Sequence, residues 1–146
     1  MSGSDDKIDL TALKTFSRWT PVTIRYSDQD GMGHVNNVAF AAYVEAARTM
    51  VLKDLMERFP RPAIKFVLAR LAIDYLREIF YPGNVEVGVR VVGVGTKSLV
   101  TGYGVFFQDY CVATAQCVNV CFDMAARSSV PLLDSIRHDL LAQIDH

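Results

Sequence analysis

One long helix-like segment dominates the first half of this chain of 146 residues. Apolar residues recur three and four positions apart between residues 38 and 58, which predicts a single helix that ends at Phe59-Pro60. Its main apolar stripe consists of Phe40, Val44, Ala47, Val51 and Leu55. Further apolar residues, Ala41, Ala42, Leu52 and Met56, lie elsewhere on the helical wheel. A helix that is apolar over so much of its circumference has to be wrapped by other structure.

Most of the remaining chain alternates between apolar and polar residues with the period of a β-strand. Strands are predicted over residues 21–26, 66–79, 85–91, 99–107 and 112–122, and a short C-terminal helix over 133–144. The segment 66–79 carries Val67, Ala69, Leu71, Ile73 and Tyr75 on one predicted face. Short turns separate the last three strands and predict an antiparallel meander. The fold class is therefore α+β: a curved antiparallel sheet wrapped around one long central helix.

Length and charge restrict the organisation and the class of ligand. The whole chain, 1–146, suits one domain, with residues 1–12 expected to be a mobile N-terminal tail. A net charge of −1 provides no basic field to hold a nucleic acid. No apolar run is long enough to cross a membrane, and the polar, acidic start is unlike a signal peptide, so a cytoplasmic protein is expected.

The cysteines and histidines give no indication of a disulfide framework or a metal site. Cys111, Cys117 and Cys121 all fall in one predicted strand, where they are expected to be apolar thiols. The three histidines show no ligand spacing with each other or with these cysteines. We expect neither a metal nor any other cofactor.

The turn before the long helix is where chemistry is expected. Asp30 lies in a segment with two glycines, and glycine allows the backbone to approach a ligand closely. Either Asn36 or Asn37 can cap the helix, whose first turn offers free N–H groups and a partial positive charge. A carboxylate next to such donors is what acyl transfer requires, because one group attacks a carbonyl and the others stabilise the oxyanion.

This segment resembles a known family. Asp28-x-Asp30-x-x-Gly33-His34-Val35-Asn36-Asn37, followed by Tyr43-Val44-Glu45-Ala46-Ala47-Arg48, is similar to the hotdog-fold 4-hydroxybenzoyl-CoA thioesterase family, bacterial acyl-CoA thioesterase branch. Residues 67–77 resemble the family's first strand after the helix, and the resemblance extends over residues 21–131. It implies a hotdog fold and an enzyme that hydrolyses an acyl-CoA to the free acid and CoA.

The resemblance also implies roles for particular residues. Asp30 is the expected catalytic carboxylate, as a nucleophile or as a general base, and the backbone N–H of Asn37 is expected to polarise the thioester carbonyl. The expected substrate-binding residues are Gly33 and His34 beside the catalytic turn, and Lys97, Ser98 and Arg127 at the nucleotide end of CoA. The expected assembly is a homodimer or homotetramer with the active site at the subunit interface.

Other acidic residues have structural interpretations. Asp28 is expected to brace the loop, and Glu45 to form an ion pair with Arg48 or Arg70. Two other functions remain open: an acyl carrier protein thioesterase, and a non-catalytic acyl-CoA-binding hotdog protein. The length and the alkyl or aryl character of the acyl group stay undetermined at this stage.

Overall fold

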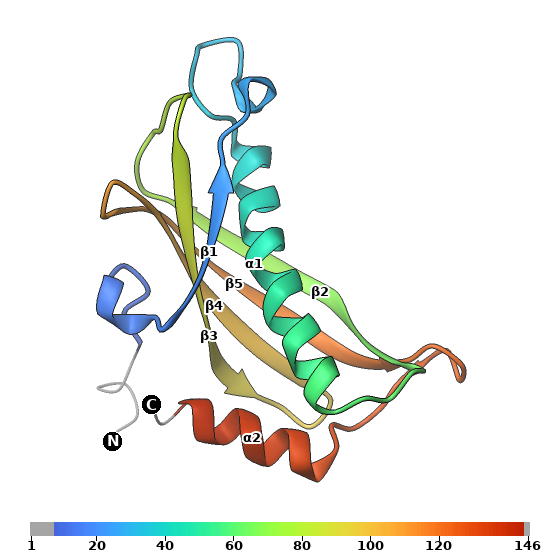
Figure 1. The fold of residues 1–146 in the computed structure, drawn as a ribbon. Coiled ribbons are helices and arrows are strands. Elements are labelled where there is room, and N and C mark those ends of the chain that lie inside the picture. Colours follow the sequence, from blue (N-terminus) through green and yellow to red (C-terminus); the bar gives the residue numbers. More distant parts are fainter. Residues whose placement is uncertain (1–7, 145–146) are drawn as a thin grey trace.

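The computed structural model describes residues 8–144 of the chain as one long helix lying across a curved antiparallel sheet (Figure 1). The helices are α1 (Asn37–Arg58) and α2 (Asp134–Ile144), and two short 3₁₀ helices span Leu13–Thr15 and Tyr26–Asp28. The strands are β1 (Arg18–Thr23), β2 (Ile64–Tyr75), β3 (Asn84–Val94), β4 (Ser98–Phe107), β5 (Tyr110–Asp123) and β6 (Ser128–Ser129). This is the hotdog architecture, so the predicted fold class is confirmed.

The strands follow the order β1-β3-β4-β5-β2, and all neighbours are antiparallel. The predicted meander is therefore confirmed in β3, β4 and β5. The tight turn between β4 and β5 places Gln108 and Asp109 at positive φ, as a two-residue hairpin connection requires. The short β6 pairs with the end of β5. The outer strands of the main path are β1 and β2, and the outer edge of β2 has no strand partner within residues 8–144.

The core lies between α1 and the concave face of the sheet. The residues of α1 that face the sheet include Phe40, Val44 and Ala47 of the predicted stripe, and they contact alternate residues of β3, β4 and β5. The last turns of α1 contact α2, which covers the far end of the same face through Ile136 and Leu140. The long helix is therefore wrapped, as its sequence requires.

Two strand predictions differ from the structure in their details. The first strand ends at Thr23 instead of residue 26, because the N–H and the side chain of Arg25 turn toward Asp28 and the chain enters a 3₁₀ helix. In β2, a bulge between Leu68 and Arg70 interrupts the alternation. Val67 consequently lies on the opposite face from Leu71, so the prediction of one continuous face was wrong for this residue.

The predicted N-terminal tail lies partly outside the described residues, which begin at residue 8. Where the structure describes it, the segment is held against the protein. The Ala12 N–H donates to the Asp9 carbonyl, and the Leu10 side chain lies over Gly102 of β4. A side chain at Gly102 would clash with Leu10 and Val92, so glycine allows this close approach. The described part, residues 8–12, is therefore not a free tail.

Candidate active site

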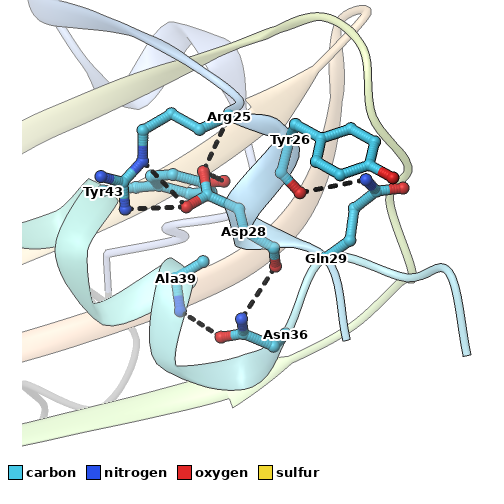
Figure 2. A network of polar contacts seen from close by, with 7 residues as sticks. All are labelled: Arg25, Tyr26, Asp28, Gln29, Asn36, Ala39 and Tyr43. Atoms are coloured by element: carbon cyan, nitrogen blue, oxygen red, sulfur yellow. Dashed lines mark hydrogen bonds and ion pairs between the residues drawn. The ribbon is translucent and has the colours of Figure 1, made fainter. Parts of the chain in front are cut away.

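The loop between β1 and α1 is held to the protein body by Asp28, whose side chain is almost fully buried (Figure 2). One carboxylate oxygen, Oδ2, accepts hydrogen bonds from the Arg25 N–H at 2.8 Å and from the Tyr43 hydroxyl at 2.7 Å. The other, Oδ1, accepts two from the Arg25 guanidinium, at 3.0 and 2.9 Å. The prediction that Asp28 braces the loop is confirmed.

These contacts keep Asp28 ionised. Burial alone raises the pKa of the Asp28 carboxyl, but the hydrogen bonds from the Arg25 N–H, the Tyr43 hydroxyl and the Arg25 side chain outweigh it, so the net pKa is lowered. Burial and the neighbouring carboxylate raise the pKa of Tyr43, which therefore remains a hydrogen-bond donor. Asp28 is accordingly occupied by structural contacts and has no free oxygen for a substrate.

The main chain of Asp28 also fixes where α1 begins. Its carbonyl accepts hydrogen bonds from both the backbone N–H and the side-chain amide of Asn36, each at 2.8 Å. The Asn36 side-chain oxygen accepts the Ala39 N–H at 2.7 Å, so Asn36 is the helix cap and Asn37 is the first helical residue. The first N–H groups of the helix, including that of Asn37, have no intrahelical acceptor.

Asp30 lies two residues further on and is exposed. Its Oδ1 accepts the N–H groups of Met32, at 2.8 Å, and His34, at 3.1 Å. The Asp30 N–H donates to the His34 carbonyl, and Gly33 closes the turn with a φ of 87°, a region that glycine adopts without strain. Among residues 8–144, no group donates a hydrogen bond to Oδ2 of Asp30. One carboxylate oxygen is thus held in place while the other is left for a ligand.

A pocket of about 270 Å³ brings three of the predicted site residues together. Asp30, His34 and Asn37 line it, with Val35, Phe40, Tyr75, Leu76, Arg77 and Glu78 as the other lining residues. The carboxylate of Asp30 therefore shares a cavity with the first residue of α1, where the partial positive charge of the helix is greatest. Such an arrangement can attack or hydrate a carbonyl group and stabilise the negative charge that develops on its oxygen.

Two lining residues were not recognised as site residues from the sequence. The Tyr75 hydroxyl donates to the Asn37 carbonyl at 3.0 Å and ties the first turn of α1 to β2. Glu78 Oε1 lies 3.4 Å from Nδ1 of His34, although the sequence offered no residue to orient this histidine. The sequence placed Tyr75 on the same strand face as Ile73, and this alternation could have indicated that Tyr75 points toward the long helix. Glu78 lies beyond the end of β2 and carried no such signal.

The other predicted substrate-binding residues lie elsewhere in the same chain. The loop that carries Asp30 is next to the start of β3, whereas Lys97 and Ser98 follow its end (Figure 1). The eleven residues of β3 separate the two ends by about 35 Å at the usual rise per residue. Arg127 lies beyond the end of β5, on the side of Lys97. Within one chain, these three residues do not meet Asp30.

The described residues contain no group of three His, Cys, Asp or Glu side chains that could hold a metal ion. Cys117 and Cys121 are buried and Cys111 is partly buried, and burial raises the pKa of all three thiols. Neither α1 nor α2 is long and apolar enough to span a bilayer. The Glu45 carboxylate lies 2.7 Å from the Arg48 guanidinium, which confirms the predicted ion pair.

Sequence comparison identifies the family. Residues 24–140, which include the Asp30 loop, α1 and the whole sheet beyond β1, match the thioesterase-like superfamily. The chain belongs to this superfamily. This thioesterase-like protein is 28% identical over 121 residues to the 1,4-dihydroxy-2-naphthoyl-CoA hydrolase of Nostoc punctiforme, covering 78% of this chain and 80% of that protein. It is 32% identical over 89 residues to YsmA of Bacillus subtilis, covering 61% of this chain and spanning only 60% of that relative.

Solved structures agree with this assignment. A thioesterase from Thermus thermophilus, solved with coenzyme A and zinc, superposes on the thioesterase-like protein with a TM-score of 0.76 and 32% identity. The match covers 90% of this chain and 97% of that one. The expected membership of the hotdog thioesterases is confirmed, and the protein is a thioester hydrolase.

Proposed function

We propose that this protein hydrolyses acyl-CoA thioesters at the pocket that contains Asp30 and the N-terminus of α1. The observation that carries the proposal is that one cavity contains two groups: Oδ2 of Asp30, which accepts no hydrogen bond from residues 8–144, and the Asn37 N–H, which has no acceptor within the helix. The relatives support CoA as the thiol half of the substrate, because one is a hydrolase of an aryl-CoA and another was solved with coenzyme A.

In the proposed reaction, the thioester carbonyl oxygen accepts the Asn37 N–H, and the helix dipole adds to the polarisation of the carbonyl. Oδ2 of Asp30 then attacks the carbonyl carbon, or removes a proton from a water molecule that attacks it. On the nucleophilic route the C–S bond breaks to give an anhydride between the acyl group and Asp30, which water then hydrolyses to the free acid. On the general-base route the attacking water supplies the oxygen of the free acid as the C–S bond breaks. On both routes the CoA thiolate leaves and takes up a proton. His34 contacts the substrate in this proposal, because it lines the same pocket with its Nδ1 3.4 Å from Glu78 Oε1.

The nucleotide half of CoA requires a second copy of the chain in this proposal. No strand of residues 8–144 pairs with the outer edge of β2, and Val67 and Leu68 of this strand are 38% and 42% exposed. Antiparallel pairing of two β2 strands around a two-fold axis gives the backbone N–H and C=O groups of each outer edge hydrogen-bond partners. It also places the Tyr75 end of one β2 next to the Ile64 end of the other.

The Ile64 end of β2 is paired with Asp123, close to Arg127 and to the turn that carries Lys97 and Ser98. The pairing therefore brings these residues of one copy toward the Asp30 pocket of the other. This supports the expectation of a homodimer or a higher homo-oligomer with a shared site. A monomeric mass by light scattering at micromolar concentration would contradict it.

The activity is tested by following free thiol release from a series of acyl-CoAs and an aryl-CoA, with the wild type, Asp30→Asn and Asp30→Ala. Removal of a general base or nucleophile is expected to lower kcat by about 100-fold or more. Asn is the sharper variant, because its amide oxygen can still accept the N–H groups that now hold Oδ1. Equal rates for all three proteins would refute the role of Asp30, and binding without any cleavage would refute the activity.

A further inference from the structure

A lateral groove lies next to the Asp30 pocket, along the side of α1. It has a volume of about 340 Å³ and is lined by Asn37, Val38, Ala41, Leu71, Ile73 and Tyr75. Two of these residues, Asn37 and Tyr75, also line the Asp30 pocket, so the two cavities share a wall at the first residue of the helix, where the Tyr75 hydroxyl donates to the Asn37 carbonyl. The remaining lining is aliphatic. A group attached to a carbonyl at Asn37 therefore lies beside an apolar groove.

The space directly beneath α1 is closed to such a group. Phe40, Tyr43 and Ala47 are at most 3% exposed, and Tyr103 on the facing strand is completely buried. These side chains belong to one packed cluster between α1 and the sheet. The groove between α1 and β2 is thus the path along which an apolar chain could extend from Asn37.

Beyond the residues that line the groove, an ion pair crosses the space between α1 and β2. Val38 and Ala41 are followed on the same helical face by Glu45 and Arg48, at the three- and four-residue spacing of neighbours on an α-helix. Arg48 is held rigidly, since it donates to the Asn119 side chain at 2.7 Å and to the Phe66 carbonyl of β2 at 3.2 Å. The Glu45 carboxylate lies against it, 46% exposed. An alkyl chain that reached this ion pair would have to remove water from its charges, which is unfavourable.

The distance available follows from the helix geometry. Glu45 is eight residues after Asn37, which corresponds to about 12 Å along the helix axis. An extended chain of single bonds advances about 1.2 Å per bond, by the dimensions of an extended backbone. A chain that starts at the Asn37 N–H can therefore hold about ten carbons before it reaches the level of Glu45.

We infer that the ion pair of Glu45 and Arg48 ends the acyl subsite, and that the substrates are thioesters of uncharged acyl groups of about ten carbons or fewer. This inference rests on the proposed thioesterase activity. Glu45 acts as a specificity-determining residue and takes no part in bond breaking. A second copy paired along β2 would extend the sheet beneath the groove, but the wall that carries Glu45 belongs to α1 of the same chain.

The test measures kcat/KM for acyl-CoAs from acetyl to palmitoyl with the wild type, Glu45→Ala, Glu45→Gln and the control Glu57→Ala. Glu57 belongs to another ion pair on α1, with Lys53, and both side chains are 66% exposed. We expect the wild-type value to fall at least tenfold between octanoyl and dodecanoyl. Glu45→Ala should recover most of that loss on dodecanoyl, Glu45→Gln should recover less because it keeps the bulk, and Glu57→Ala should follow the wild type.

The outcomes separate the two proposals. If no thioester reacts with the wild type, the proposed function fails. If the wild type cleaves palmitoyl as well as butyryl, or if Glu45→Ala leaves the chain-length profile unchanged, the thioesterase activity stands and the inference on Glu45 is overturned. An unchanged chain-length profile of Glu45→Ala would also be expected if a second copy of the chain fills the groove. Thermal unfolding of each variant checks that the half-exposed Glu45 can be replaced without loss of the fold.

Discussion

Asp28 and Asp30 are two residues apart in the same loop, yet their surroundings differ in almost every respect. Asp28 is 2% exposed and both of its carboxylate oxygens accept hydrogen bonds, from Arg25 and from Tyr43 on α1. Asp30 is exposed, and only its Oδ1 accepts hydrogen bonds from the described residues, both from amides of its own turn. Asp28 faces the helix and Asp30 faces the pocket.

The difference shows how one short loop can use a buried carboxylate, Asp28, as its anchor and present a second carboxylate, Asp30, to a pocket. Asp28 connects the loop to α1 through Tyr43 and, through its carbonyl, to the cap residue Asn36. That anchor fixes the position of the turn in which Oδ2 of Asp30 is left open. A buried carboxylate with all of its acceptor sites used contributes to stability, whereas an exposed one with a free oxygen can contribute to chemistry.

The largest effect expected from this comparison is on stability, and the same substitution at the two positions reveals it. Asp28→Asn should lower the free energy of unfolding by about 2–3 kcal/mol, because the new NH₂ group faces donors where the carboxylate oxygen accepted them. Asp30→Asn should change it by less than about 0.5 kcal/mol, because the site is exposed and the amide oxygen can still accept both N–H groups. Urea unfolding at pH 7 measures both values.

Activity supplies the matching control. Asp30→Asn should lose thiol release while it keeps wild-type stability, whereas Asp28→Asn should lose stability first. Equal unfolding free energies for the two variants would show that the contrast between a structural and a chemical carboxylate is wrong.

The contrast was only partly visible in the sequence. The long helix, the meander and the α+β class follow from periodicities that extend over many residues, and the resemblance of the Asp30 segment implied the hotdog fold; these predictions were correct. The bulge at Leu68 was not predicted, because a single extra residue in β2 is set by pairing with β5 and leaves no periodic signal. The early end of β1 also depends on a particular contact that leaves no periodic signal, because the Arg25 N–H donates a hydrogen bond to the side chain of Asp28.

For the site, the sequence predicted the Asp30 turn and the start of α1, which are adjacent in the chain. It did not reveal Glu78 beside His34 or the hydroxyl of Tyr75 at Asn37, because those residues arrive from β2 and the segment after it. Lys97, Ser98 and Arg127 were grouped with the site by resemblance. In a single chain they lie at the opposite end of the sheet, so their role stays a prediction that depends on a second copy.

The pH dependence of stability should distinguish Asp28 further. The pKa of Asp28 is lower in the folded protein than in the unfolded chain, so its contribution is fully present above the unfolded value of about 4 and is lost as the pH falls through the lower, folded pKa. The difference in unfolding free energy between wild type and Asp28→Asn should be constant from pH 7 to about pH 5 and shrink below about pH 4. Urea unfolding across this range measures it, and a difference that grows toward low pH would contradict the lowered pKa.

A smaller loss of stability than that of Asp28→Asn is expected at Asn36, which connects the Asp28 carbonyl to the start of α1. Its side-chain oxygen caps α1 and its amide donates to the Asp28 carbonyl, but its backbone N–H makes a parallel bond to that same carbonyl. Asn36→Ala should therefore cost only about 1 kcal/mol, the usual value of a helix cap. Asn36→Asp keeps the cap acceptor and should lie closer to the wild type in urea unfolding. A loss larger than that of Asp28→Asn would mean that the cap, and not the buried carboxylate, is the main anchor that holds Asp30 at the pocket.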